Sequence, residues 1–193
     1  NQSQLQIRGH ALEARIYAED ANKGFLPSTG KLVHLSPPAE SLNVRVDTGV
    51  EEGDEITPHY DPMIAKLIVW DENRDAALAR MRRALADYRV VGVTTNIDFL
   101  SRLVACPAFA GADLDTGLIE RSRGFLFPEA TATPKEVLQV AAVGELLYEA
   151  HAAREQAKTS GDPWSPWHAR DGWRLNLQAR RMIGFRDGES LVE

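Results

Sequence analysis

The sequence has 193 residues, of which 44% are hydrophobic and 26% charged, and its formal net charge is −6. This length and composition fit one ordinary globular domain or slightly more. The acidic balance argues against a general nucleic-acid binder and against a polybasic contact with a membrane surface. No apolar run approaches the roughly 20 residues of a membrane helix. The single cysteine, Cys106, rules out an internal disulfide and fits a reducing compartment.

The first predicted element is a strand at the start of residues 9–20 (GHALEARIYAED), where apolar and polar side chains alternate. One face is mostly apolar, whereas Glu13, Arg15 and Tyr17 share the other. A carboxylate, a guanidinium and a ring on one strand face form either plain solvent-exposed surface or the wall of a site. The residues alone leave both interpretations open, and plain surface is the more frequent case.

Further strands are predicted at residues 31–35, 44–47 and 50–51. The most continuous β-branched run, residues 63–70 (MIAKLIVW), predicts the central strand of a sheet. A polar cluster at residues 59–62 (HYDP) leads directly into it, and a central strand holds such groups rigidly, as sites require. Here too, surface and site both stay open.

Two amphipathic helices are predicted next. Asn73 is the N-cap candidate of the first. Its apolar stripe consists of Leu78, Met81, Leu85 and Tyr88. Residues 94–96 (TTN) are expected to cap the second, which Pro107 prevents from continuing. A short helix over residues 118–121 follows a turn.

The composition changes at residues 124–134 (GFLFPEATATP), which contain two prolines and show no periodicity. We place a domain boundary there, with one domain over residues 1–124 and a second over 125–193. The chain starts at Asn1 without a methionine or a signal-peptide pattern, and it stops shortly after a turn signal. We therefore expect a piece of a longer protein, in which parts of an active site lie elsewhere.

The second domain begins with a long predicted helix. Thr133 is the expected N-cap, Pro134 the first helical position, and Glu136 completes a capping box. The helix is expected to end near Lys158. Alternation over residues 173–177 and the turn signal Asp187-Gly188 predict a β-hairpin in a truncated unit.

Self-contained catalytic motifs do not occur in the sequence. There is no P-loop and no dinucleotide-binding glycine pattern, and the five histidines lack metal-ligand spacing. No hydrolase signature surrounds a serine or Cys106. We expect neither autonomous nucleotide binding nor a metal site nor an independent hydrolase, so the strand face and the HYDP cluster remain as candidates.

Five stretches of the sequence resemble the carboxy-terminal domain of biotin carboxylase. They are GHALEARIYAED, GFLPSTGKL, VRVDTGVEEGDEITPHYDPMIAKLIVW, NRDAALARMRRAL and GVTTNIDFL, in this order between residues 9 and 120. The resemblance implies an α+β fold, with a small antiparallel sheet flanked by helices. Biotin carboxylases are ATP-grasp ligases that use ATP with Mg and bicarbonate to carboxylate biotin through carboxyphosphate. The family's metal-binding glutamates, bicarbonate-binding arginine and glutamate base lie upstream of this domain, so the chain alone is expected to be inactive.

The resemblance assigns roles to individual residues. Arg15 matches the family arginine that faces the bicarbonate and biotin site and stabilises the biotin enolate, and Glu13 would orient it. A permanently charged guanidinium suits the charge that builds on the ureido oxygen when N1 is deprotonated. Tyr60 and Asp61 match a pair near the biotin pocket, and Thr116 matches a turn against the adenine pocket.

Quaternary contacts are also implied. Leu42 and Arg45 match dimer-interface positions of bacterial homologues, so a homo-oligomer is expected. The second domain resembles the region that links biotin carboxylase to the biotin carrier in acyl-CoA carboxylase α subunits, most of all those of the methylcrotonyl-CoA type. That region is a helix with an antiparallel β-barrel (the BT region), of which this chain would hold the start.

The expected partners are the biotin carboxyl carrier domain of the same subunit and the carboxyltransferase β subunit. Trp164, Trp167 and Trp173 fit either that interface or the core of the barrel. The compartment would be the cytoplasm of a bacterium or the mitochondrial matrix of a eukaryote. Two alternatives stay open: a non-catalytic interaction module, and the same domain from a propionyl-CoA or pyruvate carboxylase.

Overall fold

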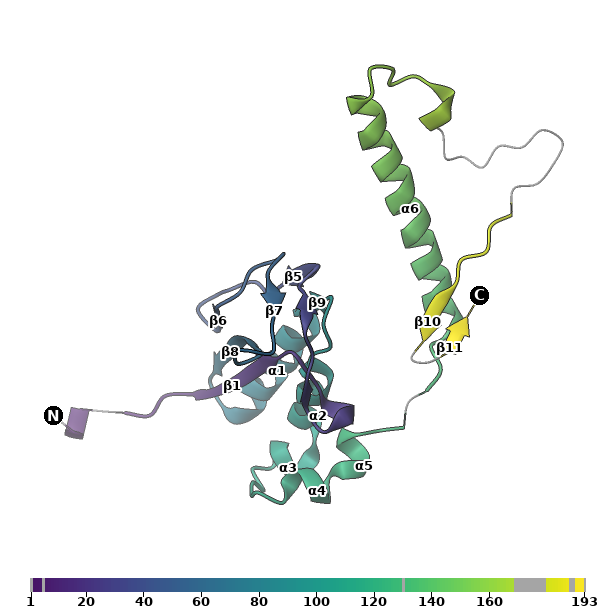
Figure 1. Ribbon diagram of the computed structural model, residues 1–193. Helices are drawn as coiled ribbons and strands as arrows, with labels where there is room; N and C mark the ends of the chain where they lie inside the picture. Colours follow the sequence, from purple (N-terminus) through teal and green to yellow (C-terminus); the bar gives the residue numbers. More distant parts are fainter. Residues whose placement is uncertain (1, 5, 130, 169–179, 188–189, 193) are drawn as a thin grey trace. The chain divides into compact units, whose positions relative to one another are not determined.

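The computed structural model describes residues 2–4, 6–129, 131–168, 180–187 and 190–192 (Figure 1). The chain forms two compact units, Asn1–Pro128 and Glu129–Glu193. In the described part of the chain, no helix has both the length and the apolar character needed to cross a bilayer. The strand predicted at residues 173–177 lies outside the described residues.

The first unit is built on a three-stranded antiparallel sheet in the order β1–β8–β6. Its strands are His10–Tyr17 (β1), Met63–Asp71 (β8) and Val44–Thr48 (β6). The predicted central strand is therefore confirmed, and Ile64, Leu67 and Val69 of β8 are fully buried. The alternation predicted for β1 is also confirmed, because Ala14 and Ile16 are buried whereas the side chains between them face solvent.

Three short antiparallel pairs form separate two-stranded sheets. They are Glu19–Asp20 (β2) with Leu26–Pro27 (β3), Gly30–Lys31 (β4) with Glu55–Ile56 (β7), and His34–Ser36 (β5) with Arg89–Val91 (β9). The single strand predicted at residues 31–35 is wrong, because the chain changes partners after Leu32. Leu32 N donates to Asp54 O at 2.8 Å, and Val33 N donates to Val91 O at 2.8 Å.

Gly92 makes this change of partner possible. Its φ is 116°, and a Cβ atom there would lie 1.9 Å from the carbonyl oxygen of Lys31, so no other residue fits. Residues 50–51, also predicted as a strand, are not in one. Nearby side chains hydrogen-bond to the backbone groups of these two residues instead. Thr48 Oγ1 donates to Val50 O at 2.9 Å, and Asp54 Oδ2 accepts from Glu51 N at 2.8 Å.

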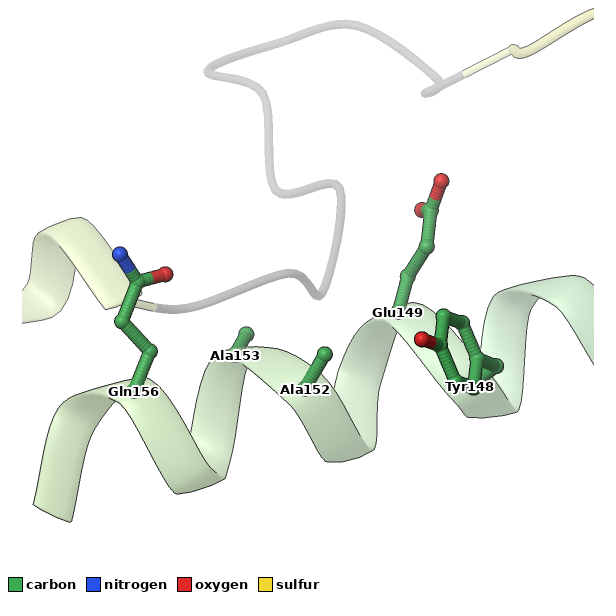
Figure 2. Close-up of a pocket in the computed structure, with 5 residues that line it drawn as sticks. All are labelled: Tyr148, Glu149, Ala152, Ala153 and Gln156. Carbon is green, nitrogen blue, oxygen red and sulfur yellow. The ribbon is translucent and has the colours of Figure 1, made fainter. Parts of the chain in front are cut away.

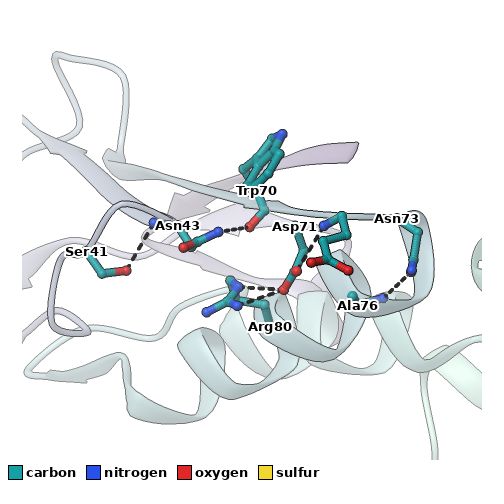
Figure 3. A network of polar contacts seen from close by, with 8 residues as sticks. Ser41, Asn43, Trp70, Asp71, Asn73, Ala76 and Arg80 are labelled. Atoms are coloured by element: carbon teal, nitrogen blue, oxygen red, sulfur yellow. Dashed lines mark hydrogen bonds and ion pairs between the residues drawn. The ribbon is translucent and has the colours of Figure 1, made fainter. Parts of the chain in front are cut away.

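Helix α1 (Arg74–Asp87) packs on the sheet with the predicted stripe, whose four residues are at most 4% exposed. Asn73 caps it as predicted, since its side chain accepts from Ala76 N at 2.9 Å. Figure 3 shows this cap beside the ion pair of Arg80 with Asp71, 2.8 Å long, which ties α1 to the end of β8. On the other side, Asn43 Nδ2 donates to Trp70 O at 3.0 Å and holds the neighbouring turn.

Four further helices complete the first unit. They are α2 (Ile97–Ala105), α3 (Pro107–Ala110), α4 (Leu118–Arg121) and α5 (Arg123–Leu126), with single turns of 3₁₀-helix at Gln2–Gln4 (η1) and Ala21–Lys23 (η2). Asn96 precedes α2 as predicted, but the expected capping bond is wrong. Its side chain bonds strand β1 instead, as described below.

In its described residues, the second unit contains helix α6 (Lys135–Thr159), a 3₁₀ turn at Pro166–His168 (η3), and a hairpin of Phe185–Asp187 (β10) and Ser190–Val192 (β11). The predicted capping box is wrong by one residue. Pro134 is the N-cap and makes no side-chain capping bond, and Thr133 N donates to Asp187 Oδ2 of the hairpin at 2.9 Å.

Apolar side chains lie on two opposite faces of α6. Leu138, Ala142 and Leu146 line a cavity of about 620 Å³ together with Ile183 and Phe185. A second apolar stripe lies on the other face and is exposed, at 54% for Val137, 73% for Val140, 66% for Leu147 and 70% for Tyr148. A smaller cavity of about 210 Å³ further along the helix is lined by Tyr148, Glu149, Ala152, Ala153 and Gln156 (Figure 2).

Tyr88, the last residue of the α1 stripe, yields a stability prediction. Its buried hydroxyl has no hydrogen-bond partner among the described residues, and burial raises the pKa of Tyr88 to about 12. An unpaired buried polar group costs about 1–3 kcal/mol, so Tyr88→Phe should keep or raise the free energy of unfolding at pH 7. The ordinary pKa is 10.0, so the wild type should lose stability between about pH 10 and 12, and the variant should lack that component. Urea unfolding at pH 7 and pH 11 tests this, and a less stable Phe variant at pH 7 would contradict it.

Candidate functional site

Strand β1 presents an ion pair on its outer face. Arg15 Nε donates to Glu13 Oε1 at 3.2 Å, and the two side chains are 60% and 45% exposed. The hydrogen bond and charge of Glu13, with a smaller contribution from Tyr17, raise the pKa of Arg15, so its guanidinium is always charged. Exposed pairs of this kind contribute little to stability. The pair therefore sets the orientation of Arg15 more than it stabilises the fold.

The sheet register brings further charges to the same outer face. Arg15 lies opposite Lys66 of β8, which lies opposite Asp47 of β6. Arg45 is on this face too and holds Asp47 through two bonds, Nε to Oδ1 at 2.7 Å and Nη2 to Oδ2 at 3.0 Å. Neighbouring strands are about 4.8 Å apart, so the backbones of β1 and β6 are about 10 Å apart. The predicted site residue and the predicted interface residue share one sheet face.

In the part of the chain that the structure describes, strand β6 has a free edge next to the predicted interface. Leu42, in the turn before it, is completely exposed. Glu40 Oε1 accepts from Val46 N at 3.0 Å and so occupies one backbone donor of the free edge. An exposed leucine beside an arginine is typical of interface composition, and the dimer role of Leu42 and Arg45 stays a prediction.

The second candidate cluster lies at the C-terminal end of β1. Ala18 N donates to Pro62 O at 2.9 Å, and Asp61 Oδ1 accepts from Met63 N at 3.0 Å. Tyr60 is 83% exposed. Burial, and then the charge of Asp61, raise the pKa of Glu19. The structure thus brings Asp61 close to Glu19, a carboxylate that the sequence argument missed although it continues the period-two pattern of residues 13, 15 and 17.

A cavity of about 350 Å³ runs along β1. Its polar lining comes from Glu13, Arg15, Tyr17, Glu19 and Asn96, and its apolar lining from β1, α1, α2 and α3. Tyr60, Asp61 and Thr116 are not among the residues that line it. The first candidate is therefore a face that borders a cavity, and the second cluster lies beside it.

Thr116 is exposed in a turn fixed by its neighbours. Asp115 Oδ1 accepts from Gly117 N at 2.8 Å and from Arg121 Nη1 at 2.6 Å. The bond from Arg121 is the main reason why the pKa of Asp115 is lowered. In the described residues, no group of three or more His, Cys, Asp or Glu side chains is placed to hold a metal ion.

Asn96 was missed as a site residue because its position predicts a helix cap. Its side chain is 6% exposed and bonds the backbone of Arg15 and Tyr17. No local sequence signal distinguishes an Asn that caps its own helix from one that bonds a strand about 80 residues away.

The small antiparallel sheet with helices on its inner face and a charged outer face matches a known class of domain. The sequence model of the biotin carboxylase C-terminal domain family matches residues 13–121, and the chain belongs to this family. The resemblance found in the sequence is thereby confirmed. Methylcrotonoyl-CoA carboxylase subunit alpha, mitochondrial, of Dictyostelium discoideum is 44% identical over 191 residues, which are 99% of this chain and 27% of that protein. The propionyl-CoA carboxylase alpha chain of Ruegeria pomeroyi is 36% identical and is covered for 26% of its length.

Solved structures agree with this assignment. The biotin carboxylase domain of a thermophilic 2-oxoglutarate carboxylase bound to bicarbonate has a TM-score of 0.64 and 36% identity, over 67% of this chain and 29% of that chain. The biotin carboxylase domain dimer from Hydrogenobacter thermophilus, in complex with MgADP, ADP and bicarbonate, has a TM-score of 0.63 and 35% identity, over 66% and 28%. The chain spans about a quarter of the length of the curated relatives.

Glu19 yields a pH prediction. The pKa of Glu19 is raised in the folded state. The contribution of Glu19 to the free energy of unfolding should therefore be least favourable above that raised pKa. It should improve as the pH falls toward 4.5, the ordinary value. Glu19→Gln should therefore raise the urea midpoint at pH 7, and the gain should shrink on acidification. The exposed Glu72→Gln is the control for the loss of one surface carboxylate. An equal gain at pH 7 and pH 4 would contradict the prediction.

Proposed function

We propose that this chain is part of the biotin carboxylase component of an acyl-CoA carboxylase, where it contributes to the ATP- and bicarbonate-dependent carboxylation of biotin. The observation that carries the proposal is the Glu13–Arg15 pair, a permanently charged donor on a rigid strand that borders a cavity. The family assignment supplies the reaction class.

Arg15 is the proposed catalytic residue. Removal of the N1 proton of biotin places negative charge on the ureido oxygen, and a fixed guanidinium stabilises that charge at no cost of reorganisation. Glu13 holds Nε, and the terminal nitrogens of Arg15 are proposed to face the substrate. Bicarbonate would supply the carboxyl group and ATP the phosphoryl group that activates it, and the ligands of ATP and Mg are proposed to lie mainly outside this chain, in an ATP-grasp region. Thr116 is proposed to border the adenine, and Tyr60 and Asp61 the biotin side.

The arrangement of α6 supports the proposed BT region. Apolar side chains occupy two opposite faces of this helix, and such a helix is normally buried all round. The hairpin β10–β11 covers one face only and would be the start of the barrel. Trp164 and Trp167 are at least 90% exposed, as expected before a carboxyltransferase β subunit or the rest of the barrel covers them.

The assembly follows from the same assignment. The biotin carboxyl carrier domain is the second proposed partner, and Leu42 with Arg45 would form a homo-oligomer contact. The proposed domain limits are residues 1–124 and 125–193. The mitochondrial names of several relatives support the matrix in a eukaryote, and a bacterial protein would be cytoplasmic. Propionyl-CoA and pyruvate carboxylases remain the alternative parents, because both names occur among the matches.

The decisive test replaces Arg15 in a full-length subunit that contains this domain. Arg15→Ala should lower the rate of biotin carboxylation by about 10²–10³-fold, the usual effect of losing one oxyanion donor. Folding should stay intact because the side chain is 60% exposed. Arg15→Lys should recover part of the rate, since it restores the charge without the fork of donors. The measurement is carboxybiotin formation with ATP and bicarbonate.

Arg82→Ala is the matched control, since Arg82 is an exposed arginine on α1. Its rate should equal that of the wild type. Wild-type activity in Arg15→Ala would instead favour an interaction module whose charged strand face is plain surface.

A further inference from the structure

We propose that Asn96 is the positioning residue for Arg15. This inference rests on the proposed function, because it assigns to Asn96 the task of fixing the strand that carries the catalytic guanidinium. Asn96 is a buried polar side chain of the first unit, 6% exposed, and its side-chain amide bonds the backbone of Arg15 and Tyr17.

Three hydrogen bonds join Asn96 to β1. The Tyr17 backbone N donates to Asn96 Oδ1 at 2.9 Å, Asn96 Nδ2 donates to Arg15 O at 3.1 Å, and the Asn96 backbone N donates to Tyr17 O at 3.1 Å. The side-chain amide thus offers one acceptor and one donor to the open edge of β1, as a peptide unit of a neighbouring strand would.

The position of these bonds along β1 gives them their importance. On its other edge β1 pairs with β8, and the register of that pairing shifts between Ile16 and Tyr17. The extra residue at this shift, Ile64, belongs to β8, and a bulge disrupts the ladder between the two strands locally. Asn96, at the start of α2, bonds the residues on both sides of Ile16. It therefore fixes the segment of β1 that the pairing with β8 holds less firmly.

The orientation of Arg15 follows from this backbone segment. Its guanidinium is largely exposed and interacts with Glu13 and Tyr17, which belong to the same strand. A shift of residues 15–17 would therefore move Arg15 and Tyr17 together, and contacts within one strand do not resist such a shift. A misplacement of about 1 Å can cost about 10²-fold in rate.

Helix α2 holds Asn96 firmly in place. Its residue Phe99 is 6% exposed and packs edge-on against Phe25 at 4.9 Å and, tilted, against Phe127 at 5.5 Å between ring centroids. Asn96 lines the same cavity as Arg15, so its hydrogen bonds to β1 lie in the wall of the site.

The test is a double-mutant cycle in the full-length subunit, with carboxybiotin formation as the readout. Asn96→Ala should lower kcat by roughly 10- to 100-fold and leave the KM for ATP unchanged. In the Arg15→Ala background the same substitution should cost nothing further, because its effect acts through Arg15. Asn96→Asp, which keeps the volume and the acceptor but loses the donor to Arg15 O, should behave in the same way and serves if the alanine variant does not fold.

Asn73→Ala is the matched control: it removes an asparagine side chain that caps α1 and has no part in the proposed site, so it should lower the unfolding temperature and keep kcat. If Asn96→Ala keeps its full kcat, or costs as much in the Arg15→Ala background as in the wild type, Asn96 is merely structural and the inference is wrong. If Arg15→Ala itself keeps the wild-type rate, the proposed function fails, and the role of Asn96 fails with it.

Discussion

The burial of strand β8 between two antiparallel neighbours and under helix α1 is the constraint on which the first unit depends. Leu67 and Val69 are fully removed from water on the inner face, and each such side chain contributes about 1.5–3 kcal/mol. Because side chains alternate along a strand, fixing these residues inward also fixes Lys66 outward. A slip of one residue would turn the charged face into the core, so core packing and site geometry are specified together.

Much of this arrangement could be predicted from the sequence because it follows from local patterns. The alternation of β1, the apolar run of β8 and the N-cap at Asn73 each depend on residues close in the chain. Two of the failures share one cause, which is competition from distant groups. The strand at residues 31–35 divides where two partners meet, and Thr133 turns away from α6 to bond Asp187.

The candidate site, too, could be predicted only where it depends on local patterns. Periodicity placed Glu13 and Arg15 on one face, and the family resemblance gave that face a chemical meaning. Neither could place Glu19 beside Asp61 or join Asn96 to the strand, since these contacts form only after the chain has folded. The helix-cap pattern even pointed the wrong way for Asn96, because one side-chain amide suits either task.

The carboxylate of Glu40 has a consequence for how copies of this domain meet. By occupying the Val46 donor, it interrupts the row of unpaired backbone groups on the outer side of β6. An incoming strand from another molecule would have to displace a charged group before it could hydrogen-bond there. Two copies can therefore approach through the side chains of this region without merging their sheets into one continuous ribbon, so specific pairing is separated from the uncontrolled strand stacking that leads to aggregates.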